Sequence, residues 1–158
     1  MRYDIFDSPI GALTVATDGE AITELHIEGD RYFTSIPSGW VREASNPVLI
    51  QARQELSAYF KGKRQVFEIP FRAQGTDFQK QVWKALEKVQ SGSTTTYSEI
   101  AMKIGKPKAV RAVGTAIGKN PICVIVPCHR VLTRSGSLGG FVAGTERKQS
   151  LLALEHAI

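Results

Sequence analysis

Apolar and polar residues alternate along much of the first 28 residues of the chain. The alternation has the period of two that is typical of a strand with one buried face, and it covers residues 2–6, 12–17 and 22–28. Residues 8–11 and 18–19 separate these segments and are rich in residues that favour tight turns. The pattern therefore predicts three consecutive strands of an antiparallel sheet.

A helix is predicted after this sheet. Residues 30–45 have no regular pattern and indicate a surface loop. Asn46, followed by a proline, is a typical helix start, and apolar residues with helical spacing continue to about Phe60. Residues 66–71 again have the pattern of a strand. Residues 72–75 indicate a linker to a second region.

The second region is predicted to be helical. Thr76 and Thr96 are each followed three residues later by Gln or Glu, the capping-box arrangement of a helix start. The helix after Thr96 is short and ends at Gly105, and Pro107 suits the first turn of a helix that continues over residues 108–117. This is the outline of a helix-turn-helix. The small residues of its second helix equally fit tight packing against a neighbouring helix.

Cys128 follows a run of apolar residues. Residues 122–126 are predicted to form a buried strand, and Pro127 ends it because proline cannot donate a ladder hydrogen bond. Cys128 is then expected in a turn, with His129 beside it in sequence. This arrangement suits a reactive thiolate, but an inert packed cysteine is the alternative. A last helix is predicted from about Thr145.

The basic residues of this 158-residue chain are concentrated in its second region. Residues 1–73 contain 8 Lys or Arg and 10 Asp or Glu, whereas residues 74–158 contain 12 and 5. The excess of +7 favours a polyanion such as nucleic acid as the partner. A generic basic surface would have the same charge.

The counts of cysteine and histidine argue against a disulfide scaffold and a zinc site. There are two cysteines, five positions apart, and three histidines with no second ligand cluster. We therefore expect no metal and a reducing compartment. No apolar segment reaches the length of a membrane span, and no signal peptide is recognisable. A cytoplasmic protein without membrane contact is expected.

An ordered set of motifs extends from Gly75 to Glu155. It comprises Phe78-Gln79, Val82-Trp83, Tyr97 with Glu99-Ile100-Ala101, Arg111-Ala112-Val113-Gly114, Asn120-Pro121, Pro127-Cys128-His129-Arg130-Val131, and Lys148 with Leu151-Leu152 and Glu155. In this order the motifs resemble the O6-alkylguanine-DNA alkyltransferases, also called methylated-DNA–protein cysteine methyltransferases. The first 73 residues match only in outline, as a β-rich region followed by a helix.

The resemblance implies direct-reversal DNA repair without a cofactor. A methyl or alkyl group would move irreversibly from the 6-oxygen of guanine in duplex DNA to Cys128, once per molecule, and the 4-oxygen of thymine is left open as a second substrate. The implied fold is α/β (α+β), with a ribonuclease-H-like N-terminal domain over residues 1–73 and a helical winged-helix or helix-turn-helix domain over residues 74–158. A monomer is expected that binds the minor groove of double-stranded DNA and flips the damaged base, in a bacterial or archaeal cytosol and at the nucleoid when on DNA.

The resemblance also implies roles for five catalytic residues. Cys128 is the nucleophile, His129 its base acting through a water, and Glu155 the carboxylate that orients the imidazolium. Tyr97 supplies a proton to the leaving guanine, and Asn120 hydrogen-bonds the cysteine turn. Without the motifs, Glu155 would be read as a solvated residue at a helix end, Tyr97 as a core aromatic and Asn120 as part of a simple turn.

Arg111 resembles the arginine that fills the space of the flipped base, with an ordinary phosphate contact as the alternative. The other DNA-binding residues that the resemblance implies are Lys108, Ala109, Thr96, Lys119 and Arg134. The residues implied at the substrate pocket are Val131, through its backbone carbonyl, Phe141 and Val142.

The chain departs from the family at the pocket loop. The family commonly has Gly-Tyr where this chain has Gly140-Phe141, and Val142 stands where some members have a hydroxyl side chain. We expect activity to persist, with altered preference among bulky alkyl groups. Three other functions are weighed: a binding-only relative, although such proteins lack the cysteine; a winged-helix regulator with Cys128 as a sensor; and a cysteine hydrolase, which leaves the basic region unexplained.

Overall fold

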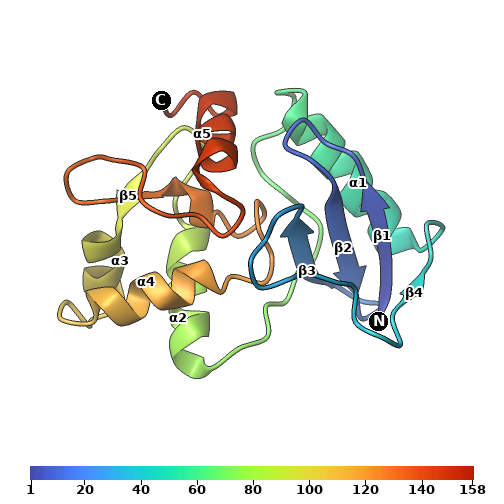
Figure 1. The fold of residues 1–158 in the computed structure, drawn as a ribbon, viewed down its shortest axis with the longest axis horizontal. Coiled ribbons are helices and arrows are strands. Elements are labelled where there is room, and N and C mark those ends of the chain that lie inside the picture. Colours follow the sequence, from blue (N-terminus) through green and yellow to red (C-terminus); the bar gives the residue numbers. More distant parts are fainter.

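The computed structural model describes residues 1–158 and places two regions side by side (Figure 1). One contains a sheet and one helix; the other is mainly helical. The elements are β1 (Arg2–Phe6), β2 (Leu13–Thr17), β3 (Ile22–Ile27), β4 (Val41–Arg42), α1 (Pro47–Phe60), α2 (Asp77–Glu87), β5 (Thr95–Thr96), α3 (Tyr97–Lys103), α4 (Val110–Gly118), the 3₁₀ turn η1 (Cys128–Arg130), β6 (Val131–Leu132) and α5 (Thr145–Leu154).

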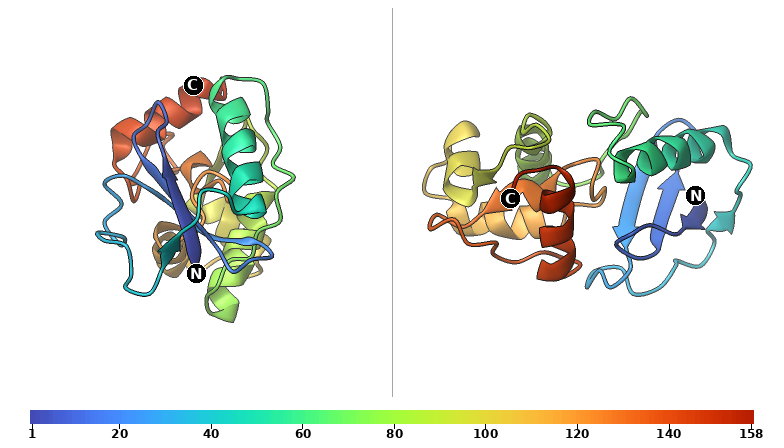
Figure 2. Two further views of the ribbon diagram at one scale, coloured as in Figure 1. Left: turned by 90° about the vertical axis from the view of Figure 1, so that its right-hand side faces the viewer. Right: turned by 90° about the horizontal axis from the view of Figure 1, so that it is seen from above.

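The N-terminal sheet has the strand order β3-β2-β1-β4. The three predicted strands form and pair antiparallel, as expected. The short strand β4 was not predicted and pairs parallel to β1. Helix α1 covers one face of the sheet (Figure 2), and the Asn46 side chain caps it by accepting from the N–H groups of Val48 and Leu49. Strand β3 forms one edge of the sheet, on the side of the helical region (Figure 1).

The helical region follows the predicted order, with two corrections. Thr76 and Gln79 form the full capping box of α2. At α3 only the threonine half forms, because the Glu99 carboxylate accepts instead from the Thr95 hydroxyl at 2.8 Å. Helix α4 begins at Val110, later than predicted, because the chain between α3 and α4 continues as a turn through residues 107–108. The helix-turn-helix outline is present.

Two predicted strands do not form. Residues 66–71 and 122–126 each make a single parallel bridge to β3, from Phe71 to Ile22 and from Ile122 to Leu25. Each bridge is preceded by a proline, Pro70 or Pro121, whose missing N–H stops a ladder from extending. Residues 122–126 were misread as a strand because burial, and not pairing, selected their side chains. In residues 66–71 only Ile69 is buried, and the alternation there has no ladder of paired residues behind it.

Residues 122–126 form a buried turn in place of a strand. The N–H of Val126 donates to the carbonyl of Ile122 at 2.9 Å, and Val124 has a φ of +72°. The turn is attached to β3 by two backbone hydrogen bonds, from Leu25 to the Pro121 carbonyl and from Cys123 to the Leu25 carbonyl. The segment that leads to Cys128 is thus held by the N-terminal sheet.

One hydrophobic core spans both regions. Its buried side chains include Leu25 of β3, Leu56 of α1, Leu86 of α2 and Leu151 of α5. Because this core is continuous, side chains from either region can reach a shared site without crossing solvent. None of the helices has the length and apolar character of a membrane span.

Candidate active site

Cys128 lies at the start of η1, directly after the buried turn. Its side chain is 3 % exposed and lines a cavity of about 200 Å³. The cavity is lined by residues from α3, α4 and two loops: Arg31, Tyr97, Gly114, Ile117, Gly118, Cys128, Gly140, Phe141 and Val142. The structure therefore brings Cys128, Tyr97, Phe141 and Val142 together, as the sequence analysis expected.

The cysteine turn is held by the buried side chain of Asn120. Its Nδ2 donates to the Val126 carbonyl at 2.7 Å, and its Oδ1 accepts from the Ile122 N–H at 3.0 Å. A side chain that satisfies both ends of a turn fixes the direction in which the chain leaves it. Asn120 thus occupies the place expected for a residue that positions Cys128.

The surroundings of Cys128 favour its thiolate. A hydrogen bond from the Cys123 thiol is the main cause that lowers the pKa of Cys128, against the opposing effect of burial. Hydrogen bonding by Asn120 and the nearby charge of Lys148 lower the pKa of Cys128 further. The same contact and burial raise the pKa of Cys123. Cys128 is therefore the thiol of this pair that ionises first.

His129 and Glu155 form a buried pair. Nε2 of His129 lies 2.8 Å from Oε2 of Glu155, and neither side chain is more than 1 % exposed. Nδ1 of His129 is buried and has no hydrogen-bond partner in the protein. Burial lowers the pKa of His129, which Glu155 opposes, so the imidazole is a neutral base near pH 7. The free nitrogen could accept a proton through a water, as the relayed arrangement requires.

Glu155 also binds residues to which the sequence analysis gave no role. Arg130 donates to it twice, from Nε at 2.9 Å and from Nη2 at 2.8 Å, and the Tyr59 hydroxyl donates to it at 2.5 Å. Burial would raise the pKa of Glu155, but hydrogen bonds from Arg130 and His129 hold it at about 2. Arg130 is part of the quoted Pro-Cys-His-Arg-Val motif, whereas Tyr59 carries no local signal.

Lys148 is a third residue whose role was missed. It is fully buried, and its Nζ donates to the carbonyls of Leu138 and Gly140. These hydrogen bonds attach the loop before Phe141 to α5. Desolvation lowers the pKa of Lys148 to about 8, against the effect of Cys128. The place of Lys148 among the family motifs is the sequence signal that could have identified it.

Tyr97 packs closely against the pocket loop. A Cβ at Gly139 would lie 3.3 Å from the Tyr97 hydroxyl and 3.1 Å from Cγ2 of Thr133, and the φ of Gly139 is +71°. Only glycine fits there without strain. Burial raises the pKa of Tyr97, so the phenol remains protonated and available as a donor. Val131 is fully buried in β6 and does not line this cavity, so its pocket role stays a prediction.

The expected DNA-binding residues lie around α4 and its neighbours. Arg111, Lys108, Lys119 and Arg134 are exposed. Ala109 is the N-cap of α4. The Thr96 side chain caps α3 by accepting from the Glu99 N–H. Their contacts with DNA remain predictions. No group of three His, Cys, Asp or Glu side chains is placed to hold a metal ion.

Two family descriptions match the chain. Residues 1–73 match "6-O-methylguanine DNA methyltransferase, ribonuclease-like domain", and residues 77–157 match "6-O-methylguanine DNA methyltransferase, DNA binding domain". The chain is also 43 % identical over 155 residues to a methylated-DNA–protein-cysteine methyltransferase of Methanosarcina barkeri, covering 98 % of this chain and 97 % of the relative. A Haemophilus influenzae protein of the same name is 42 % identical over 156 residues, covering 98 % of this chain and 86 % of the relative.

Solved structures give the same result. The chain is similar to Mycobacterium tuberculosis OGT in complex with DNA, with a TM-score of 0.91 and 44 % identity over 99 % of this chain and 94 % of that one. An O6-methylguanine DNA methyltransferase from Methanococcus jannaschii has a TM-score of 0.69 and 26 % identity over 98 % of this chain and 94 % of that one. The likeness therefore extends over both regions.

Proposed function

The chain belongs to the 6-O-methylguanine DNA methyltransferase family, and from this premise we propose that it repairs alkylated DNA by direct transfer of the alkyl group to Cys128. The substrate is double-stranded DNA that contains 6-O-alkylguanine. Each chain reacts once, because the thioether formed is not reversed. No cofactor takes part. We place the protein in the cytoplasm, where it acts as a monomer.

The two regions divide the work in this proposal. Residues 74–158 bind DNA and hold the reacting groups, and residues 1–73 form the ribonuclease-like domain that supports them. The damaged base must leave the duplex stack, which costs a few kcal/mol. Arg111, exposed on α4, occupies the vacated space, since its long planar cation can stack there and offset phosphate charge. The exposed Lys108, Lys119 and Arg134 add attraction to phosphates.

The transfer is a displacement at the alkyl carbon. The proton of Cys128 passes through a water to Nδ1 of His129, and the resulting imidazolium is stabilised by Glu155. The sulfur of Cys128 then forms a bond to the alkyl carbon as the bond between carbon and the 6-oxygen breaks. The electron pair stays with the guanine, which takes a proton from Tyr97. The Cys-His-carboxylate order is that of other activated nucleophiles.

The buried His129–Glu155 pair beside Cys128 carries this proposal. One ring nitrogen of His129 binds a carboxylate, and the other is buried without a hydrogen-bond partner. A buried polar atom without a partner destabilises the fold, and a role in proton transfer explains why it is there. The lowered pKa of Cys128, caused chiefly by Cys123, supports the same reaction.

The test is to incubate the protein with duplex DNA that contains 6-O-methylguanine and to weigh the peptide that carries Cys128. We expect one methyl group per chain and none in Cys128→Ser, since a hydroxyl at this position is a far weaker nucleophile. Binding without methyl gain would favour a binding-only protein. Repeated turnover would contradict a single-use acceptor.

A further inference from the structure

Tyr59 lies on α1, in the N-terminal region, yet its hydroxyl reaches the active site. It is 2.5 Å from Oε2 of Glu155, a residue 96 positions later in the chain. The tyrosine is 2 % exposed, and the side chain of the glutamate is 1 % exposed. A buried hydrogen bond to a carboxylate is among the stronger ones in proteins, because no water competes for either group.

Oε2 of Glu155 is shared by three donors. Besides Tyr59, Nε2 of His129 and Nη2 of Arg130 each lie 2.8 Å from it. An ionised carboxylate can only accept hydrogen bonds, so the proton of the neutral imidazole must reside on Nε2. Nδ1, the nitrogen without a protein partner, then carries the lone pair. The hydrogen bonds at Glu155 therefore decide which nitrogen is the base.

We propose that Tyr59 is a positioning residue of the alkyl-transfer site: its hydroxyl fixes the Glu155 carboxylate and moderates the hold of that carboxylate on His129. This inference rests on the proposed function and extends it. Tyr59 touches neither the alkyl group nor the guanine in this account. It acts through Glu155, and it makes the N-terminal region a contributor to the reaction.

The physical reason is competition for one oxygen. A phenol that donates to Oε2 offsets part of its negative charge, so the carboxylate attracts an imidazolium less strongly. Burial lowers the pKa of His129, and the nearby cations of Arg130 and Lys148 lower it further. The pKa of Glu155 at about 2 keeps the carboxylate ionised, and burial raises the pKa of Tyr59, so the phenol remains a donor.

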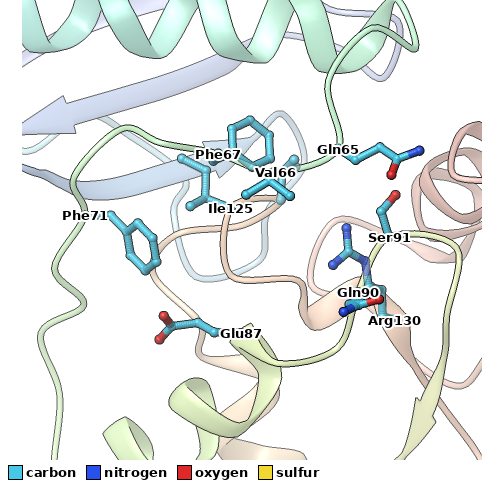
Figure 3. A pocket seen from close by; sticks show the side chains of 10 residues that line it. Gln65, Val66, Phe67, Phe71, Glu87, Gln90, Ser91, Ile125 and Arg130 are labelled. Atoms are coloured by element: carbon cyan, nitrogen blue, oxygen red, sulfur yellow. The ribbon is translucent and has the colours of Figure 1, made fainter.

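The position of Tyr59 is fixed by aromatic packing where the two regions meet. Its ring packs on Phe67 at 5.4 Å and edge-on against Phe60 at 5.1 Å. Phe67 and Arg130 both line a second cavity, of about 440 Å³, and approach it from opposite regions (Figure 3). Arg130 is held there by the Val89 carbonyl at 2.5 Å. One wall of this cavity, Phe67, thus packs on Tyr59, and the other, Arg130, binds Glu155 itself.

The test is Tyr59→Phe, which removes only the donor. We expect alkylation of Cys128 at pH 7 to slow about ten- to a hundredfold, the range of one lost hydrogen bond to a charged group. His129 should have a higher pKa, measured by NMR in the DNA-free protein, so the acid limb of the rate profile moves to higher pH. A merely structural residue would not move that limb.

Tyr3→Phe is the matched control, since Tyr3 lies half-buried on β1 beside Trp40. It should leave both the rate and the pH profile unchanged. Site-specific 3-fluorotyrosine at position 59 keeps the shape and strengthens the donor, so it should move the pKa of His129 in the opposite direction. This second variant decides the matter if Tyr59→Phe does not fold.

The two proposals fail in different ways. If Tyr59→Phe reacts at the wild-type rate with an unchanged His129 pKa, Tyr59 has no positioning role, while the proposed function stands. If the wild-type protein takes up no methyl group, the proposed function fails. The His129 pKa measurement, which needs no substrate, still judges Tyr59.

Discussion

The charged groups around Glu155 and those on α4 are organised in opposite ways. Glu155, His129 and Arg130 are buried and paired with one another. Arg111 and Lys119 are exposed at α4, and no ion pair within the chain involves them. The first set is completed by the fold itself, whereas the second is left for an external partner.

This difference separates chemistry from recognition. Changes around Glu155 should affect stability and should slow the reaction with every substrate, including a free 6-O-alkylguanine base. Changes on α4 should leave stability and the reaction with a free base unaltered, and should weaken only the reaction with duplex DNA. Each variant can therefore be assigned by measuring unfolding, duplex repair and free-base reaction together.

The largest effect is expected for Glu155→Gln. Removing one partner of a buried ion pair leaves Arg130 without a counter-charge, which typically costs about 3–5 kcal/mol. The free energy of unfolding should fall by this amount, and alkylation of duplex and free base should slow equally, by about 100-fold, as His129 loses its partner. Glu146→Gln, exposed on the same helix α5, is the control and should change stability by no more than about 0.5 kcal/mol.

The pH dependence of unfolding gives a second measure of Glu155. Its pKa is held at about 2 in the folded protein, below an ordinary value of 4.5, chiefly by Arg130 and His129 against burial. A lowered pKa stabilises the fold above the ordinary value, and that stability is lost as pH falls from 4.5 towards 2. Glu155→Gln should flatten the curve in this window. An unchanged slope would contradict the buried ion pair.

Arg111→Ala should have a smaller effect, confined to duplex DNA. Without the side chain, the cost of extruding the base is not offset, and repair should slow about tenfold or more. Lys119→Ala is the comparison: it should weaken binding to all duplexes alike and reduce the salt dependence by about one counterion. Arg111 would be only a phosphate contact if the two variants behaved identically.

The sequence predicted the elements whose signals are local. The alternation in β1–β3, the Asn46 cap of α1 and the Thr76 capping box each specify structure within a few residues, and all three form. The misread strands at 66–71 and 122–126 depend on partners that local patterns do not contain. Residues 122–126 look like a strand because they are buried in the shared core, whereas residues 66–71 alternate around a single buried side chain, Ile69.

The same limit applies to the site. The motif residues Cys128, His129 and Glu155 were found by their resemblance to a family; the structure pairs His129 with Glu155 and places Cys128 in the cavity with Tyr97. Tyr59 had no such signal, because a tyrosine in a helix normally packs in a core and its partner lies 96 residues away. Interactions that join two regions are visible only once the regions are placed.

The smallest effect is expected for a change at Cys123, the buried thiol that lowers the pKa of the nucleophile Cys128. Cys123→Ala removes the thiol whose hydrogen bond is the main cause that lowers the pKa of Cys128. The pKa of Cys128 should rise towards its ordinary value, so the thiolate limb of the rate profile should move to higher pH and alkylation at pH 7 should slow a few-fold. Cys123→Ser, which keeps a donor of similar size, should stay close to the wild type. Because Cys123 is fully buried and out of reach of DNA, the reactions with duplex DNA and with free base should slow by the same factor. Unequal slowing would show that the turn before Cys128 also shapes DNA binding, and the separation of chemistry from recognition would then fail at this point.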